Sequence, residues 1–149
     1  MAQQTQEQRL VELLGCGLAL RSTDGGGLFD LTFTPDGRDL AIVSGIDALA
    51  QDLRIALTTG LGTDPFDLNF GFDGAAAMAE ETDPNLTRER LRVAVIRVLQ
   101  LDPRISRIRA VDFDDSPESR SARQLPVVAT FEILGGTVAT LTLSTGALP

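Results

Sequence analysis

A strict two-residue alternation near the end of the chain constrains the fold more than any other feature of the sequence. Between residues 127 and 134, every second side chain belongs to one apolar face, whose members are Val127, Ala129, Phe131 and Ile133. Gly135 and Gly136 follow, and residues 138–143 repeat the alternation with Thr140 and Thr142 on the opposite face. This period, with glycines between the two runs, predicts an antiparallel β-hairpin that turns one face toward a core.

Two segments have the period of helices that could cover this face. In residues 46–59 one stripe is apolar and consists of Ile46, Leu49, Ala50, Leu53, Ala56 and Leu57. Ser44 stands where it could cap the start of this helix, and Gly60 and Gly62 mark its end. We therefore expect a helix that packs this stripe on the sheet.

The second helix is expected over about residues 86–101. Asp83 and Pro84 suit its cap and first turn, although Thr87 is an alternative start. Its main apolar stripe consists of Leu91, Ala94, Val95 and Val98, while Val93 and Ile96 lie on the opposite side. Either the domain covers this helix on both sides, or one side faces a partner.

A further amphipathic helix is expected at residues 4–14, ended by Gly15. Residues 22–27 (Ser-Thr-Asp-Gly-Gly-Gly) then suggest a flexible joint. The helix is either a frayed terminus or an arm that docks on a neighbouring molecule. We accordingly divide the chain into an arm and joint, residues 1–27, and a folded domain, residues 28–149.

Within that domain, residues 29–43 alternate around a Pro-Asp-Gly turn at 35–37 and predict another hairpin. Residues 105–113 predict one more strand. The expected fold class is α+β: a single domain with a mostly antiparallel sheet, two main helices packed on it, and an N-terminal helical arm.

The connections carry weaker signals. Residues 62–74 form a loop bounded by glycines, with Phe66, Leu68, Phe70 and Phe72 as apolar anchors expected to pin it down. A short helix is expected near residues 75–81, and a polar excursion at residues 114–124.

Composition excludes several classes of function. The chain has no histidine and only one cysteine, Cys16, which excludes an internal disulfide, histidine-based catalysis and the usual zinc sites. The net charge of −8 argues against a nucleic-acid partner. The absence of an 18-residue apolar run, together with a polar start, predicts a cytoplasmic chain with no direct membrane insertion. We expect no enzymatic activity, cofactor or metal.

Charge is also unevenly distributed. Residues 24–83 hold twelve acids and two arginines, a local charge of −10, whereas residues 88–109 hold seven arginines and two acids, a local charge of +5. All thirteen basic residues are arginine, a side chain suited to bidentate contacts with carboxylates at interfaces.

Two groups of short motifs carry a resemblance to a known family. The first group comprises Ser44-Gly45, the helical stripe after it, the turn from Thr59 to Asp64, and Phe70-Gly71. The second is the segment Leu99 to Ile105, which leads directly into a strand. In this order and spacing they resemble the baseplate wedge family of contractile phage tails, whose relatives occur in type VI secretion systems and contractile injection particles.

The resemblance spans about residues 28–145 and has departures. The family pattern contains a Thr-x-x-Gly turn, followed by a Glu-Arg pair, and a later Glu-Pro-Arg corner. Thr59 and Gly62 match the turn, but Thr63 and Asp64 replace the pair. Pro103 and Arg104 match the corner, while Asp102 replaces the glutamate.

The resemblance implies a structural role in which the chain docks on the helical core of a baseplate wedge through the Asp102-Pro103-Arg104 corner. It also implies that the C-terminal hairpin templates the first sheath ring. The expected partners are other wedge proteins and the sheath subunit, in a multi-copy assembly. The candidate partner-binding residues are Gly62, Phe70, Gly71, Asp102, Pro103, Arg104, Val128, Thr130, Thr140 and Thr142.

The chemistry of the two surfaces leaves alternatives. Pro103 would end the helix and display Arg104 for a carboxylate or carbonyl of the partner, or else Asp102 and Arg104 pair internally and only trim the helix end. The second strand of the hairpin carries neither charge nor proline, which is typical of an edge that accepts another strand. Alternatively, the protein's own N-terminal arm covers this edge.

Two rival functions remain. A tail-associated peptidoglycan hydrolase would need a carboxylate pair, for which Glu80, Glu81 and Glu89 are the candidates. A cytoplasmic adaptor or chaperone-like domain could use the hairpin and the two-sided helix. A wedge protein should enter a defined complex, whereas an enzyme should remain alone.

Overall fold

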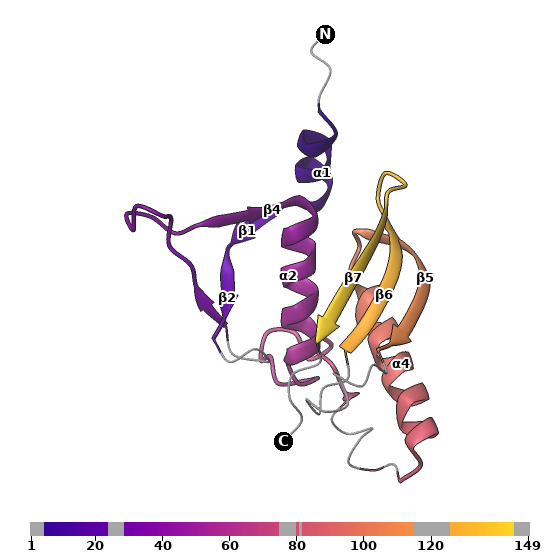
Figure 1. The fold of residues 1–149 in the computed structure, drawn as a ribbon. Coiled ribbons are helices and arrows are strands. Elements are labelled where there is room, and N and C mark those ends of the chain that lie inside the picture. Colours follow the sequence, from indigo (N-terminus) through magenta and orange to yellow (C-terminus); the bar gives the residue numbers. More distant parts are fainter. Residues whose placement is uncertain (1–4, 24–28, 75–79, 81, 115–125, 145–149) are drawn as a thin grey trace.

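A three-stranded antiparallel sheet, covered on one face by two helices, forms the centre of the molecule (Figure 1). The computed structural model describes residues 5–23, 29–74, 80, 82–114 and 126–144. The sheet has the order β5 (Ile105–Phe113), β6 (Pro126–Ile133) and β7 (Val138–Ser144). Helices α2 (Gly45–Thr58) and α4 (Pro84–Leu101) pack on its inner face, which confirms the expected α+β class.

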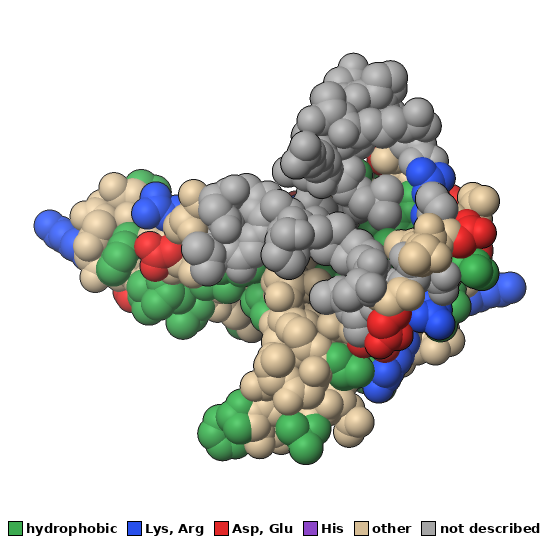
Figure 2. Space-filling view, turned by 90° about the horizontal axis from the view of Figure 1, so that it is seen from below, with side chains coloured by type: hydrophobic (Ala, Val, Ile, Leu, Met, Phe, Trp, Pro, Cys, Tyr) green, Lys and Arg blue, Asp and Glu red, His purple; other side chains and the backbone are tan. Residues whose placement is uncertain are grey.

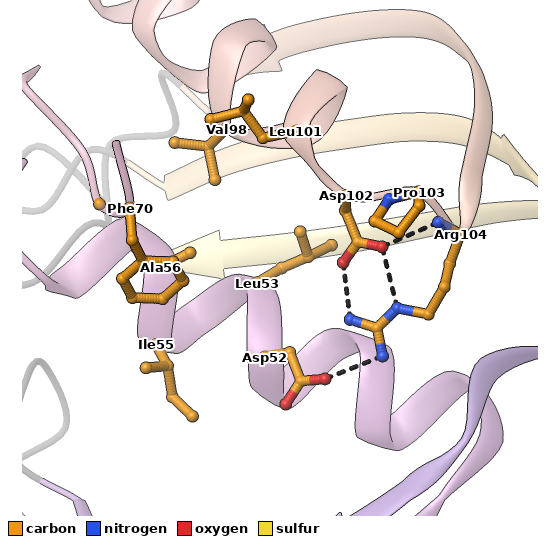
Figure 3. A pocket seen from close by; sticks show the side chains of 11 residues that line it. Asp52, Leu53, Ile55, Ala56, Phe70, Val98, Leu101, Asp102, Pro103 and Arg104 are labelled. Carbon is orange, nitrogen blue, oxygen red and sulfur yellow. Dashed lines mark hydrogen bonds and ion pairs between the residues drawn. The ribbon is translucent and has the colours of Figure 1, made fainter. Parts of the chain in front are cut away.

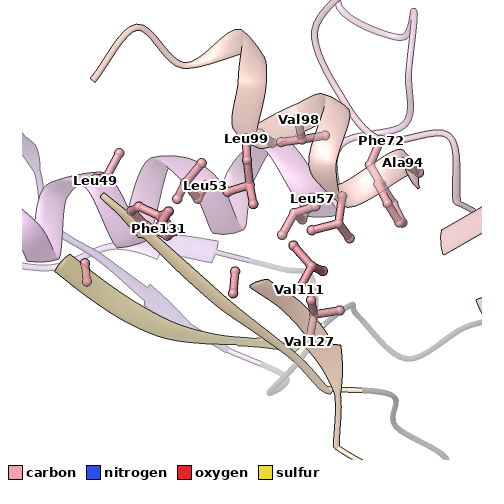
Figure 4. Packing of buried hydrophobic residues seen from close by; sticks show 14 of the residues in the cluster. Leu49, Leu53, Leu57, Phe72, Ala94, Val98, Leu99, Val111, Val127 and Phe131 are labelled. Carbon is pink, nitrogen blue, oxygen red and sulfur yellow. The ribbon is translucent and has the colours of Figure 1, made fainter. Parts of the chain in front are cut away.

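The C-terminal hairpin forms as the alternation predicts. The four apolar side chains of β6 that share a face are completely buried and meet both helices (Figure 4): Val127, Ala129, Phe131 and Ile133. Thr140 of β7 lies opposite Thr130 and is exposed. Gly135 and Gly136 adopt φ of 94° and 84°, a region that favours glycine, so the turn requires them.

Helix α2 matches its predicted stripe, which is buried against α4 and the sheet except for a half-buried Ile46. The predicted cap is wrong in one respect. Ser44 takes the N-cap position, but its side chain makes no capping hydrogen bond. Its backbone instead ends strand β4 (Ile42–Ser44), opposite Cys16.

Helix α4 begins at Pro84 because the Asp83 carboxylate accepts the N–H of Asn85 at 2.8 Å, so the alternative start at Thr87 is wrong. Leu91, Val95 and the rest of the main stripe are buried. On the opposite side, Ile96 is half-buried and Val93 is exposed. Among the described residues, this helix is therefore not covered all round.

The N-terminal helix α1 (Gln6–Leu14) packs on α2, so it is not a frayed terminus, and docking of this helix on a neighbouring molecule stays a prediction. Thr5 and Gln8 close a reciprocal capping box at its start, and Leu14 is buried in the core. The division of the chain at residue 27 stays a prediction, and most of the expected joint lies outside the described residues.

Residues on both sides of that joint pair with each other in two short ribbons. Strand β1 (Cys16–Leu18) pairs with β4, and β2 (Leu20–Ser22) pairs with β3 (Phe29–Leu31). The predicted hairpin within residues 29–43 forms around its turn, where an antiparallel bridge joins Phe33 and Leu40 and the Ala41 N–H donates to the Thr32 carbonyl at 2.8 Å. Farther from the turn the two strands separate, so the pairing predicted between β3 and β4 themselves is wrong. The reason is competition: residues 16–22 provide both strands with longer partners.

These ribbons form an arm that projects from the helices (Figure 1). The lobe at the left of Figure 2, in the position of this arm, carries hydrophobic side chains along one side. Large apolar residues of the arm are accordingly exposed, including Leu18, Leu31, Phe33 and Ile42.

The loop after α2 is held by its backbone rather than by all four predicted anchors. Phe72 is buried and Phe70 is half-buried, but Phe66 is 97% exposed and Leu68 is also exposed. The Asp64 carboxylate accepts the N–H of Phe66, which fixes a local turn without burying the aromatic ring. The short helix expected near residues 75–81 and the excursion at 114–124 lie almost entirely outside the described residues. None of the described helices has the length and apolar character that a bilayer span requires.

Candidate functional site

An apolar groove of about 430 Å³ brings the two groups of motifs together (Figure 3). Helix α2 contributes Ile55 and Ala56, and the end of α4 contributes Val98 and Leu101. Asp52 and Leu53 of α2 also line it, together with Phe70-Gly71 and the Asp102-Pro103-Arg104 corner. Five of the ten predicted partner-binding residues thus line one groove, although about 30 residues separate the two motifs in the sequence.

The corner forms because Asp102 leaves the helical conformation. Its φ of −83° and ψ of 114° are those of extended backbone, which a following proline favours. The Asp102 carboxylate then accepts the Arg104 N–H at 2.9 Å and receives a fork of two side-chain bonds, 2.9 Å from Nε and 2.6 Å from Nη2. This bidentate pair fixes the direction in which strand β5 starts.

Arg104 also joins the corner to two other helices. Its Nη1 donates to the Asp52 carboxylate of α2 at 2.8 Å (Figure 3). The same Nη1 also donates to the Leu14 carbonyl at the end of α1 at 3.1 Å. The side chain is only 22% exposed. Arg104 is therefore not displayed toward solvent as predicted, and the internal pair is formed. Whether the corner docks on a partner stays a prediction.

The ionisation of this cluster follows from its contacts. Partial burial acts to raise the pKa of Asp102, but the hydrogen bonds from Arg104 outweigh this effect and hold the pKa below its ordinary value of 3.8. The hydrogen bond to Asp102 raises the pKa of Arg104, against the opposing effect of burial. Both groups are charged at neutral pH.

Gly71 allows the loop to reach the groove. Its φ is 109°, and an added Cβ would lie 2.7 Å from the Gly60 carbonyl oxygen and 2.8 Å from that of Thr59. At this close approach the Phe72 N–H donates to the Thr59 carbonyl at 2.8 Å. Gly62, with φ of 75°, donates to the Phe70 carbonyl at 3.3 Å. The Thr-x-x-Gly turn and the Phe-Gly step therefore interlock and place Phe70 in the groove wall.

The other four predicted residues lie on the sheet, away from the groove. Val128 and Thr130 are half-buried on its outer face, and Thr140 and Thr142 beside them are exposed. The Thr130 and Thr140 hydroxyl oxygens are 3.3 Å apart. The predicted residues therefore fall on two separate surfaces, the groove with its adjoining loop and the outer face of the sheet.

Strand β7 is an edge of the sheet, since β6 is its sole strand partner in the part of the chain that the structure describes. The N-terminal strands do not cover this edge, because β1 and β2 pair with β4 and β3 instead. The alternative that the protein's own arm occupies the edge is therefore wrong for the described residues.

Two of the residues proposed for a hydrolase, Glu80 and Glu89, line one further pocket, and each is paired with an arginine. Glu80 pairs with Arg90 at 3.5 Å and Glu89 with Arg92 at 2.6 Å, while Glu81 lies outside the described residues. Cys16 is an exposed free thiol in β1. Across the described ranges, no cluster of three acidic or cysteine side chains is arranged to hold a metal ion.

Sequence reasoning missed the role of Asp52 and the exposure of Phe66. Asp52 looks like an ordinary polar residue of an amphipathic helix, and nothing in its spacing links it to Arg104, which follows 52 residues later. Phe66 lies between two aspartates, Asp64 and Asp67, a signal that could have indicated an exposed turn.

In comparisons with known proteins, the chain is similar to solved structures. No protein-family model matches the chain, and no curated protein sequence matches it. A crystal structure of a candidate tail lysozyme from Geobacter sulfurreducens, determined at 1.44 Å resolution, matches with a TM-score of 0.53 and 20% sequence identity. The match covers 70% of this chain and 92% of that chain. At this identity the likeness shows that the two proteins share a fold.

Proposed function

We propose that this chain is a structural baseplate component of a contractile phage tail or a related injection machine. In this proposal the groove surface docks on the wedge core, and the β7 edge templates the first sheath ring. The observation that carries the proposal is the convergence of both groups of resembling motifs on one open apolar groove. Such a groove suits the apolar face of a partner helix.

The internal pairing of Arg104 changes how the corner contributes. The Arg104 guanidinium already bonds to Asp102, Asp52 and the Leu14 carbonyl. It therefore forms a rigid wall of the groove and does not itself reach out to bond a partner. The docking energy would then come from apolar side chains such as Ile55, Phe70 and Leu101.

The shared fold supports a role related to phage tails, because the matched protein is described as a candidate tail lysozyme. The open edge of β7 supports strand addition, because an unpaired ladder gives affinity through main-chain bonds with little demand on sequence. These observations fit an assembly component with two interaction surfaces.

Two matched variants of α4 test the docking surface. Leu101 lines the groove and Val93 lies outside it, and they are 56% and 66% exposed, so a glutamate at either position should leave folding intact. We expect Leu101→Glu to abolish co-purification with co-expressed wedge proteins and Val93→Glu to preserve it. Equal recovery of both variants in the complex would contradict docking through the groove.

A tail-associated peptidoglycan hydrolase is the second candidate, favoured by the description of the structural neighbour. Glu80 and Glu89 are largely exposed and paired with arginines, whereas the general acid of lysozyme lies in a hydrophobic pocket, which argues against this function. Clearing of peptidoglycan by the pure chain, abolished in Glu80→Gln or Glu89→Gln, would establish this function instead. A chaperone-like adaptor would bind unrelated cytoplasmic proteins rather than enter one complex of fixed composition.

A further inference from the structure

A second groove, of about 510 Å³, runs beside the β7 edge. Helix α2 forms its floor with Asp47, Ala50, Gln51 and Arg54, Thr142 of β7 lies on one side, and Phe29 of the arm lies on the other. The Gln51 side chain fixes the arm wall, because it accepts the Leu20 N–H at 2.8 Å and donates to the Leu18 carbonyl at 2.9 Å. The groove is thus bounded by elements that are held to one another.

The backbone of β7 offers bonding groups toward this groove. The Ile133 N–H donates to the Thr137 carbonyl at 2.9 Å, which sets the alternation of the β6–β7 ladder. Every second residue from Thr137, including Ala139 and Leu141, therefore bonds to β6. The N–H and C=O groups of Thr140 and Thr142 point to the outer side of β7, where a further strand could pair with them.

The opposite edge of the sheet is closed to such pairing. Strand β5 has irregular register at two places, between Ile105 and Arg107 and between Ile108 and Ala110. Arg92 of α4 donates through Nε to the Val111 carbonyl at 2.9 Å, and its guanidinium lies 5.7 Å from the centre of the Phe113 ring. Bulges and arginines at a strand edge disfavour pairing with another strand, so β7 is the edge of this sheet that suits strand addition.

The floor of the groove carries two opposite charges in a fixed order. Asp47 and Arg54 are both exposed, and neither forms an ion pair with the residues that the structure describes. They lie seven residues apart on α2, about 10.5 Å along the helix axis. Helix α2 and strand β7 run in the same direction (Figure 1), and Asp47 lies in the first turn of α2, ahead of Arg54 along the helix.

We infer that this groove binds an extended segment of another chain, paired antiparallel to β7, in which an acidic residue precedes a basic residue. A segment that runs antiparallel to β7 passes Arg54 before Asp47, so its acidic side chain meets Arg54 and its basic side chain meets Asp47. Because a strand rises about 3.4 Å per residue and alternate side chains share a face, the two charges stand two or four residues apart. This inference rests on the proposed function and defines the chemistry of the strand that β7 accepts.

Two ten-residue peptides of alternating threonine and valine, with capped ends, test the inference. One has Glu four residues before Lys, and the other has Lys four residues before Glu. We expect the full chain to bind the Glu-first peptide about 3- to 10-fold more tightly, since two exposed ion pairs favour it. Hydrogen exchange of the Thr140 and Thr142 amides should slow on binding, while exchange along β5 should not change.

A charge-reversed variant supplies the matched control within the protein. Asp47→Arg with Arg54→Asp should reverse the preference and favour the Lys-first peptide. Arg107→Asp with Asp112→Arg reverses two exposed charges on β5 and should leave the preference unchanged. Circular dichroism checks that each variant is folded, and the preference of the wild type tests the inference without them.

Each contrary outcome has a distinct meaning. Equal affinity for both peptides, with slowed exchange at Thr140 and Thr142, would overturn the inferred charge order but leave strand addition at β7 intact. Slowed exchange along β5 would overturn the assignment of the edge. Failure of both peptides to bind would overturn the inference together with the templating part of the proposed function, while docking through the other groove would still stand on its own test.

Discussion

Arg104 holds three helices and the start of β5 through four side-chain hydrogen bonds, and its replacement by alanine removes all of them. The two bonds to Asp102 matter most, because this carboxylate is only 13% exposed and would lose its counter-ion. Hydrogen bonds to charged groups contribute about 1.5–3 kcal/mol each when buried, and partial exposure reduces this. The bond to Asp52, which is 48% exposed, adds less.

We therefore expect Arg104→Ala to lower the free energy of unfolding by about 3 kcal/mol and the Tm by about 6–12 °C. The Arg104 backbone N–H still donates to Asp102 in this variant, which limits the loss. Urea unfolding and thermal unfolding at pH 7 measure both quantities. Arg107→Ala, an exposed arginine three residues away, is the control and should change stability by less than about 0.5 kcal/mol.

A Tm for Arg104→Ala within about 2 °C of the wild type, below the shift that 1 kcal/mol produces, would refute the reasoning. It would mean that the Arg104 side chain does not bond to Asp102, Asp52 and the Leu14 carbonyl in solution. Arg104 would then be available to contact a partner, as the sequence predicts. Arg104→Lys provides a second check, since a point charge cannot make the bidentate contact and should restore only part of the stability.

Three further predictions concern the Gly71 turn, the Asp102 carboxylate and the β7 edge. Gly71→Ala should destabilise the chain by about 3 kcal/mol, because its Cβ meets two carbonyl oxygens at positive φ, whereas Gly17→Ala, with open space around it, should be neutral in the same urea titration. Since the pKa of Asp102 in the folded chain lies below 3.8, the ionised carboxylate stabilises the fold above pH 3.8, and this stabilisation is lost as the pH falls through the folded pKa. The difference in unfolding free energy between wild type and Asp102→Asn should therefore be full at pH 6 and shrink toward pH 2. A difference that stays constant over this range would contradict the expectation. Thr140→Pro removes an outward N–H without breaking a β6–β7 bond, so electron microscopy should show baseplates that contain the variant but carry little or no sheath, and normal sheaths would contradict the templating role.

The elements that could be predicted are those whose signal is local. The stripe of α2 and the alternation of β6 each specify a buried face within a few residues, and both faces are buried as expected. The Asp83-Pro84 start of α4 is equally local, because the cap needs only the N–H two residues later.

The features that sequence reasoning missed depend on choices between distant partners. Strands β3 and β4 could pair with each other or with residues 16–22, and the alternation of apolar residues is compatible with both. Likewise, Arg104 could point outward or inward, and the decision depends on Asp52 and the Leu14 carbonyl, which only the folded chain brings near.

The candidate site could be predicted in part from the sequence. Phe70-Gly71 and the 102–104 corner were singled out by a family resemblance, not by periodicity, and each alone is a short and common motif. Their meeting in one groove requires the Gly71 approach to Thr59 and the packing of α4 on α2. The apolar members of that groove, such as Ile55 and Leu101, carry no sequence signal that separates them from ordinary helix positions.

The most direct test of the central claim is electron microscopy of contractile particles from cells that produce this chain, the same cells lacking it, and cells that produce Leu101→Glu in its place. We expect the chain to lie in the baseplate beneath the first sheath ring, and particles without it or with Leu101→Glu to lack extended sheaths. Val93→Glu, on the same helix but outside the groove, should restore them. Extended sheaths of normal number and length in cells lacking the chain would contradict the proposal that it is a baseplate component from which the sheath starts.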